Sequence, residues 1–282
     1  MADAKKILKK AGGRNRRSTR RPSSSRSKRP QTARWKQVIA VAAVTAFALF
    51  CTYHLFLKEI IYRFTPCNGT KIFSTCIPNG YSVFGIDISH HQGDIDWEEF
   101  SKENQHDAPI SFVYMKATEG SDHKDTRFDE NWAQAKKGGF LRGAYHYFST
   151  TSTGLAQANM FINNVAVEKG DLPPMVDVEE IPEDKAKFIE ELKIFIAKIE
   201  EHYGVMPIIY SGKNYKEKYL YDKFFDRFPT WIAHYYVEKL EVETEWLIWQ
   251  CTDKGEIPGI GRKVDINVFN GELQQLESLL IR

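Results

Sequence analysis

Two short acidic segments, far apart in the chain, carry side chains that could perform acid–base chemistry. Segment 85–93 (Gly-Ile-Asp-Ile-Ser-His-His-Gln-Gly) contains Asp87, and segment 174–180 (Pro-Met-Val-Asp-Val-Glu-Glu) contains Asp177 and Glu179. Each holds its carboxylates at the end of an apolar run typical of a buried strand, where a charge is costly unless it is paired or used. Asp177 and Glu179 are two residues apart, so on a strand they share a face, with about 7 Å between their Cα atoms. Crowded carboxylates suit acid-catalysed bond cleavage, since one group can stay protonated while its neighbours stay charged.

These carboxylates need a scaffold, and the chain after residue 80 alternates between strand and helix signals. Several apolar or β-branched runs have the length of strands that are covered on both faces. Eight strands are expected, at 83–89, 110–116, 143–148, 174–179, 206–211, 230–235, 246–250 and 265–269. Helices are expected at 128–137, 155–168, 184–203 and 273–281, with a shorter one between the fifth and sixth strands.

The clearest helix is 184–203, where apolar residues recur at helical spacing and Gly204 follows as a stop signal. Between the sixth and eighth strands the pattern indicates loops and turns. Eight strands, with helices mainly among the first five, predict an α/β barrel whose second part has lost its helices.

The acidic residues fall where a barrel enzyme would place them, at the carboxyl ends of the strands. Asp87 ends the first expected strand, Glu119 follows the second, and Asp177 and Glu179 end the fourth. Asp265 instead opens the eighth strand. Because strand boundaries predicted from sequence shift by a few residues, we keep Asp265 in the predicted site.

Aromatic residues near the same strand ends could line a binding cleft. Tyr145, Tyr147, Tyr235 and Trp249 have flat faces on which a ligand could stack, and a tyrosine hydroxyl can add a hydrogen bond. Alternation places Tyr145 and Tyr147 on one face of their strand. The alternative is that all four fill the barrel core; we favour Tyr147 and Trp249 for the cleft.

His90 and His91 raise the question of a metal site. Adjacent residues on a strand point to opposite faces, so these two would not chelate one ion together. No histidine or cysteine cluster has the spacing of zinc ligands. The sequence therefore predicts neither a metal nor another cofactor.

The first 57 residues differ sharply in charge from the rest of the chain. Residues 1–37 hold 14 Lys/Arg and one acid, whereas the remainder holds 25 Lys/Arg and 36 Asp/Glu. Such an acidic body is a poor candidate for non-specific nucleic-acid binding. Residues 38–57 form an uncharged apolar run that, as a helix, spans a bilayer core of about 30 Å. The basic residues before this run predict a cytoplasmic N-terminus and an extracytoplasmic body.

We favour a single-pass anchor over a cleaved signal peptide, because the apolar run is long for a signal peptide and no Ala-x-Ala site follows it. Cys51 is a weak lipoprotein candidate, since the bulky Phe50 precedes it. The basic tail is expected to be disordered and to set topology and contact anionic lipid, with nucleic acid as the alternative partner. The expected organisation is a basic disordered cytoplasmic tail (1–37), a transmembrane signal-anchor helix (38–57), a stalk (58–80) and a barrel (81–282).

The cysteine pattern is sparse. Cys67 and Cys76 flank a short loop and could form a disulfide outside the cytoplasm, with two free thiols as the alternative. Cys251 follows an apolar run and is expected to be a buried, small hydrophobic residue.

Taken together and in order, the motifs resemble family 25 glycoside hydrolases, the N-acetylmuramidases often called Chalaropsis-type lysozymes. The resemblance runs from about residue 81 to the C-terminus. It is carried by segments 85–93, 112–120 (Phe-Val-Tyr-Met-Lys-Ala-Thr-Glu-Gly), 143–148 (Gly-Ala-Tyr-His-Tyr-Phe), 177–179 (Asp-Val-Glu), 231–235 (Trp-Ile-Ala-His-Tyr), 249–250 (Trp-Gln) and 264–267 (Val-Asp-Ile-Asn).

This resemblance implies an irregular (β/α)5(β)3 barrel that cleaves the β-1,4 bond after N-acetylmuramic acid in peptidoglycan glycan strands. It implies that Glu179 is the catalytic acid and that Asp87, Asp177 and Asp265 support it in one acidic pocket. Asp177 would assist the substrate's own N-acetyl group, with retention of configuration, or would act as a nucleophile. Glu119 would line the same pocket.

Two other functions compete with hydrolysis. One is a non-catalytic peptidoglycan-binding barrel, against which the full set of acidic residues argues. The other is a metal-dependent deacetylase, which would require histidines clustered around an aspartate.

Overall fold

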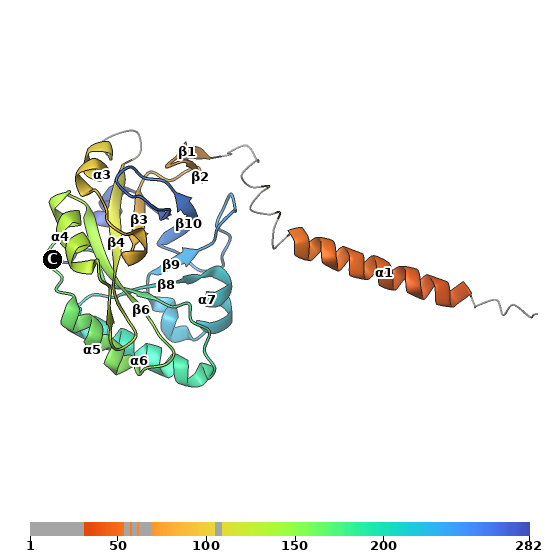
Figure 1. The fold of residues 1–282 in the computed structure, drawn as a ribbon. Helices are drawn as coiled ribbons and strands as arrows, with labels where there is room; N and C mark the ends of the chain where they lie inside the picture. Colours follow the sequence, from red (N-terminus) through yellow and green to blue (C-terminus); the bar gives the residue numbers. More distant parts are fainter. Residues whose placement is uncertain (1–30, 54–56, 58–60, 62–68, 105–108) are drawn as a thin grey trace, which may run out of the picture. The chain divides into compact units, whose positions relative to one another are not determined.

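The computed structural model describes residues 31–53, 57, 61, 69–104 and 109–282 (Figure 1). The chain divides into two units, and the second begins at Ile61. In the first unit, helix α1 (Gln31–Thr52) contains the stretch Arg34–Thr52, which is long and apolar enough to cross a membrane and has no buried residues. The helix begins seven residues before the predicted span at 38–57. Residues 54–56 of that span and most of the predicted basic tail lie outside the described residues.

The second unit is built on a closed barrel of eight strands (Figure 1). Closure follows from the pairing of β3 with β11 on one side and with β4 on the other. Neighbouring strands are parallel except at β11, which runs antiparallel to both β10 and β3. The barrel strands are β3 (Phe84–Ile88), β4 (Ile110–Glu119), β6 (Leu141–Tyr147), β7 (Met175–Asp177), β8 (Ile208–Gly212), β9 (Thr230–Ala233), β10 (Ile248–Gly255) and β11 (Val264–Phe269). All eight predicted strands are therefore present, and β5 (His123–Lys124) adds a short hairpin to β4.

A helix follows each of the first five barrel strands, and these helices surround the strands in Figure 1. The fully described chain from β9 to β11 contains no helix. The helices are α3 (Trp97–Glu103), α4 (Phe128–Lys137), α5 (Gly154–Asn164), α6 (Lys185–Tyr203) and α7 (Lys213–Tyr219), with α8 (Leu273–Glu277) at the C-terminus. Two 3-10 helices, η2 (His90–Gln92) and η3 (Lys223–Arg227), complete the described unit.

Helix α6 shows how local sequence sets these elements. The Asp184 carboxylate accepts hydrogen bonds from two backbone amides of the first turn, and Gly204 ends the helix in the left-handed conformation with φ 69°. Two other predicted helices end early: α5 stops at Asn164 because Val165 is extended, and α8 stops at Glu277.

The strands separate two apolar layers. Outward-facing residues pack beneath the helices, and inward-facing aromatic residues fill the barrel. In the interior, Tyr114 and Trp231 meet edge to face with ring centroids 5.0 Å apart, and the Tyr114 hydroxyl donates to the Pro173 carbonyl at 2.9 Å. Gly143 makes room for this packing, since a Cβ there would lie 2.3 Å from the Tyr114 ring. The barrel interior is therefore a packed core rather than a pore, and it supports the residues at the carboxyl ends of the strands.

A hairpin, β1 (Thr70–Ile72) and β2 (Thr75–Ile77), lies within the segment predicted as a stalk. Ile77 is fully buried in the outer apolar layer, and the Glu256 amide donates to the Phe73 carbonyl at 2.8 Å. This part of the predicted stalk therefore belongs to the folded unit. Cys76 is disulfide-bonded, whereas its predicted partner Cys67 lies outside the described residues.

Candidate active site

The strand directions bring the predicted acidic residues to one end of the barrel. Asp87 lies near the carboxyl end of β3, Asp177 is the last residue of β7, and Glu179 follows two residues later. Asp265 lies at the start of β11 and is directly opposite Asp87 in the strand register. Because β11 runs antiparallel, its first residues reach the end of the barrel where its neighbours finish. The predicted strand start was therefore nearly right, and the strand direction explains why Asp265 belongs with the others.

Asp87 is held by two amide side chains. Its Oδ2 accepts hydrogen bonds from Gln250 Nε2 and from Asn267 Nδ2, both at 2.8 Å. Burial raises the pKa of Asp87 to about 6, even though these hydrogen bonds favour the charged form. Asp87 can thus change its charge near neutral pH.

Gln250 and Asn267 were present in the recognised motifs, but the sequence did not reveal their role. Gln250 Oε1 accepts from the Tyr210 hydroxyl at 2.8 Å and from the Tyr235 hydroxyl, which orients Nε2 toward Asp87. Asn267 Oδ1 accepts from Trp231 Nε1 at 2.9 Å, which orients its own amide in the same way. The available signal was that each of these amide residues lies within a predicted strand that is otherwise largely apolar.

Asp177 and Glu179 have different surroundings. Asp177 is 7 % exposed, and its Oδ1 is buried without a hydrogen bond in the part of the chain that the structure describes. Burial raises its pKa well above the ordinary value; the charges of Glu179, Asp87 and Asp265 add to this effect, and Lys116 opposes it. Two carboxyl groups of unequal exposure therefore lie next to one another.

Glu179 is exposed and free to meet a substrate. Its Oε1 accepts one long hydrogen bond, 3.5 Å, from the Tyr210 hydroxyl. Desolvation by the surrounding residues raises the pKa of Glu179, and the charge of Asp87 raises it further. Burial and the Asp87 charge likewise raise the pKa of Asp265 to about 9. The cluster as a whole therefore holds protons at pH values where isolated carboxyls are charged.

Of the other predicted residues, the structure brings four to this end of the barrel. Glu119 accepts a hydrogen bond from Lys116 Nζ at 2.6 Å. The Tyr147 ring centre lies 4.7 Å from the same Nζ, and Tyr145 is buried close enough for Asp87, Asp177 and Asp265 to raise its pKa, after burial itself. The Tyr235 hydroxyl contacts Gln250, as described above.

Trp249 is placed elsewhere. It is fully buried in the outer apolar layer, its Nε1 donates to the His234 carbonyl at 2.8 Å, and its ring packs against Tyr81 and Trp246. The ring offers no face to a sugar, so we do not retain Trp249 as a sugar-binding residue. Its neighbour Gln250 points into the barrel instead, because successive strand residues alternate.

The histidine pair also differs from expectation. His90 and His91 lie on η2 rather than on a strand, and their rings are 4.0 Å apart, so they do not point to opposite faces. His90 Nδ1 is bonded to Asp125 Oδ2 at 2.7 Å. Within the described residues, no group of three or more His, Cys, Asp or Glu side chains could hold a metal ion.

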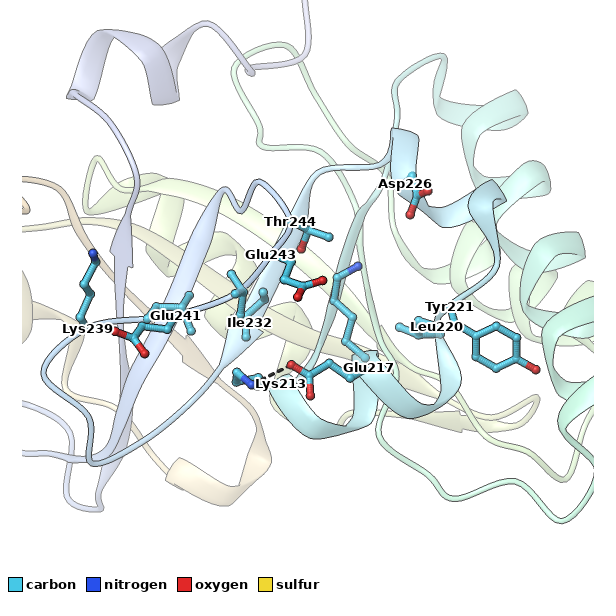
Figure 2. Close-up of a pocket in the computed structure, with 13 residues that line it drawn as sticks. Lys213, Glu217, Leu220, Tyr221, Asp226, Ile232, Lys239, Glu241, Glu243 and Thr244 are labelled. Carbon is cyan, nitrogen blue, oxygen red and sulfur yellow. Dashed lines mark hydrogen bonds and ion pairs between the residues drawn. The ribbon is translucent and has the colours of Figure 1, made fainter.

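A groove of about 1000 Å³ lies apart from this cluster, between α7 and the segment 239–244 (Figure 2). Ile232, on the outward face of β9, lines it, and Lys213 and Glu217 form an ion pair on one wall at 2.7 Å. The groove exists where the barrel lacks a covering helix. None of the predicted site residues lines it.

Exposed Glu179, buried Asp177 and the flanking Asp87 and Asp265 form an acidic site at the open end of an α/β barrel. One carboxyl group can donate a proton to a leaving oxygen, and a charged neighbour can stabilise the positive charge that develops on a sugar. This arrangement is that of a glycoside hydrolase.

Comparison with known proteins identifies the family. The model of the Glycosyl hydrolases family 25 matches residues 86–260. The chain is 37% identical over 221 residues to the uncharacterized protein YegX of Escherichia coli K12, covering 78% of this chain and 80% of that one. It is 32% identical over 213 residues to lysozyme M1 of Streptomyces globisporus, covering 70% and 71% of the two chains. The structure of a family 25 glycosyl hydrolase from Bacillus anthracis superimposes with a TM-score of 0.65 at 35% identity, covering 72% of this chain and 95% of that one. The chain belongs to glycoside hydrolase family 25, which confirms the resemblance.

Proposed function

We propose that this protein hydrolyses peptidoglycan, cutting the β-1,4 bond between N-acetylmuramic acid and N-acetylglucosamine. Its relatives include lysozyme M1, and the solved structures that it resembles include a bacterial lysozyme from Streptomyces coelicolor. The observation that carries the proposal is the pairing of an exposed Glu179, whose pKa is raised by desolvation, with a buried Asp177 whose Oδ1 has no partner in the described chain. The scaffold would be the irregular (β/α)5(β)3 barrel of the family.

In this proposal Glu179 is the general acid that protonates the leaving sugar oxygen. Asp177 Oδ1 accepts a hydrogen bond from the N–H of the substrate's N-acetyl group, and the acetyl oxygen attacks the anomeric carbon, so configuration is retained. Asp87 and Asp265 keep the site acidic, while Glu119, Tyr145, Tyr147 and Tyr235 line the sugar-binding cleft. The alternative role of Asp177 is direct nucleophilic attack.

Mass analysis of the products tests the bond specificity. The full-length chain, purified in mild detergent, should release muropeptides whose reducing end is N-acetylmuramic acid. Borohydride reduction would label that sugar as muramitol. Products that end in reduced N-acetylglucosamine would assign the opposite bond, and wall binding without any soluble product would favour the non-catalytic alternative.

We further propose that helix α1 anchors the barrel outside the cytoplasm. The apolar stretch Arg34–Thr52 and the basic residues before it support an N-terminus on the cytoplasmic side. The partners of the protein would then be peptidoglycan glycan strands and the lipid around α1, with anionic lipid headgroups contacting the basic tail.

Fractionation of cells tests the anchor. The full-length protein should remain in the membrane pellet after alkaline carbonate extraction, and external protease should digest the barrel in spheroplasts. As the matched control, replacing Val41 and Val44 with Arg should release the protein, because each charge at the centre of a span costs about 2.5–3.5 kcal/mol. A mature N-terminus downstream of residue 52 would show instead that the segment is a cleaved signal.

A further inference from the structure

A second pocket, of about 440 Å³, lies between the loops that follow β6 and β7. One wall is the loop 149–153, and another is the segment 180–184, which begins one residue after Glu179. Lys187 and Glu191 of α6 also line it. Because both loops leave the carboxyl ends of their strands, the pocket lies at the same end of the barrel as the acidic site. Its volume is in the range of pockets that bind small ligands.

The loop 149–153 presents five hydroxyl groups in succession, with the sequence Ser-Thr-Thr-Ser-Thr. Gln157, fully buried on α5, fixes this loop: its Nε2 donates to the Ser149 and Ser152 carbonyls at 2.8 and 3.0 Å, and its Oε1 accepts from the Ser149 amide at 2.8 Å. The hydroxyl oxygen of Ser152 is buried and has no hydrogen-bond partner among the described residues. An unpaired buried hydroxyl is costly, so a polar ligand in this pocket would satisfy a group that the fold leaves unpaired.

The charged residues that line the pocket are mostly acidic. They are Glu180, Glu183, Asp184 and Glu191, with Lys187 as the one basic residue of the lining. Two of the carboxylates hold the walls in place. Glu180 Oε2 accepts from the Thr150 amide at 2.7 Å and so joins the two loops, and Asp184 Oδ1 accepts from two amides at the start of α6.

Glu183, Glu191 and Lys187 remain available to a ligand. Glu183 is exposed. Glu191 Oε2 accepts from the Gly154 amide at 2.7 Å, and its other oxygen has no hydrogen bond within the described part of the chain. Lys187 is exposed and forms no ion pair with any residue that the structure describes. The pocket therefore suits a ligand that carries an ammonium group for the two carboxylates and a carboxylate for Lys187.

The aromatic residues of the pocket argue against a sugar as this ligand. Phe148 and Phe188 line it, but both are buried in the outer apolar layer, where their ring centroids lie 6.0 Å apart. Neither ring offers an exposed face on which a sugar could stack. Hydroxyls and charges thus dominate the accessible walls, which favours a charged peptide over a second stretch of glycan.

We propose that this pocket binds the stem peptide of peptidoglycan: Glu183 and Glu191 pair with the free ammonium of its diamino acid, and Lys187 pairs with the carboxylate that diaminopimelate carries beside that ammonium. The inference rests on the proposed function, which places the sugar that bears the stem at Glu179. The diamino acid is the third residue of the stem, and three extended residues span roughly 10 Å. A stem that starts at this sugar therefore has the length to reach a pocket whose wall begins at residue 180.

Steady-state kinetics of the full-length protein on three soluble glycan substrates test this site. The strands carry diaminopimelate tripeptides, carry lysine tripeptides, or have lost their stems to an amidase. We expect kcat/KM to fall by about tenfold or more from the first substrate to the third, because a hydrogen bond to a charged group typically contributes a factor of about ten or more. Lysine strands should fall in between. The differences should lie in KM, since the pocket binds ground state and transition state alike.

Replacing both Glu183 and Glu191 with Gln should remove most of the preference for stem-bearing strands. Glutamine at position 191 can still accept from the Gly154 amide, and strands without stems, which do not reach the pocket, should report an intact fold by being hydrolysed at the wild-type rate. Lys187→Met should abolish the difference between diaminopimelate and lysine strands, because lysine lacks the carboxylate that Lys187 would bind.

The matched controls are Glu201→Gln and Lys198→Met. These two residues form an exposed pair at 2.9 Å on the same helix, α6, and do not line the pocket. Both variants should equal the wild type on all three substrates.

Equal kcat/KM on stem-bearing and stem-free strands would overturn the inference and leave the proposed function standing. Pocket variants that slow stem-free strands as much as stem-bearing ones would assign the pocket to a sugar, which also overturns it. A wild-type protein that releases no product from any strand would contradict the proposed function instead. Calorimetric titration with the free tripeptide L-Ala-γ-D-Glu-diaminopimelate would then decide the pocket: binding that the double variant loses would support the site, and no binding to the wild type would refute it.

Discussion

Replacing Glu179 with Gln should lower kcat/KM for peptidoglycan hydrolysis by about 10²–10⁴-fold, the usual contribution of a general acid. Glutamine keeps the shape of the side chain and can still accept a hydrogen bond from Tyr210, but it has no proton of suitable acidity for the leaving oxygen. Because Glu179 is exposed, its replacement should leave the thermal unfolding midpoint close to that of the wild type.

The adjacent carboxylate provides the control for this variant. Glu180 Oε2 accepts a hydrogen bond from the Thr150 amide at 2.7 Å, so Glu180 links its own segment to the loop that follows β6. Glu180→Gln keeps an acceptor oxygen for that bond and should retain activity within a few-fold of the wild type. Full activity in Glu179→Gln, measured as reducing ends released over a range of pH, would remove Glu179 from the mechanism.

Much of the barrel could be predicted because its signals are local. The stripe of α6, its Asp184 cap and its Gly204 stop lie within twenty residues of one another, and the structure reproduces them. The strands of the early parallel part are apolar runs that are buried on both faces. Asp177 and Glu179 were identifiable because charges are rare at the end of such runs.

The direction in which each buried side chain points was harder to predict. In β10, Trp249 and Gln250 are both buried, so polarity alone does not say which of them faces the interior. The structure answers this through pairing: Gln250 lies opposite Asn267 of β11, and both amides reach Asp87. That hydrogen-bond network depends on residues 87, 250 and 267, which come from three separate strands and carry no joint signal in a single sequence.

Asp265 illustrates the same limit for strand direction. The residues of β11 do not reveal that this last strand runs antiparallel to its neighbours. Its direction depends on how the chain returns to pair with β3. The hairpin at 70–77 shows the same limit. It belongs to the folded unit because Ile77 packs into the outer apolar layer next to β10, and a contact between such distant residues leaves no local signal in the sequence. The sequence therefore indicated most of the acidic side chains of the candidate site. The residues that contact them became apparent only from the strand topology.

Replacing Asp177 with Asn should lower kcat/KM by about 10²–10³-fold, the typical effect of losing one group that stabilises transition-state charge. Asparagine fits the same volume in the buried position at the end of β7, so the fold should persist. It loses the negative charge that the proposed mechanism places next to the N-acetyl nitrogen. Asp129→Asn, which changes an exposed carboxylate of α4 that pairs with Lys124, serves as the charge-matched control and should hydrolyse at the wild-type rate.

Peptide mass analysis of enzyme quenched during turnover then separates the two roles of Asp177. If the substrate's own acetyl group attacks, the segment that contains Asp177 should carry no sugar, although the products retain their configuration. A glycosyl ester on Asp177 in the wild type, absent from Asp177→Asn, would establish the nucleophilic route. It would assign covalent attack to Oδ1, which has no hydrogen-bond partner among the described residues. Inverted products would contradict both routes, since each proceeds through two displacements at the anomeric carbon.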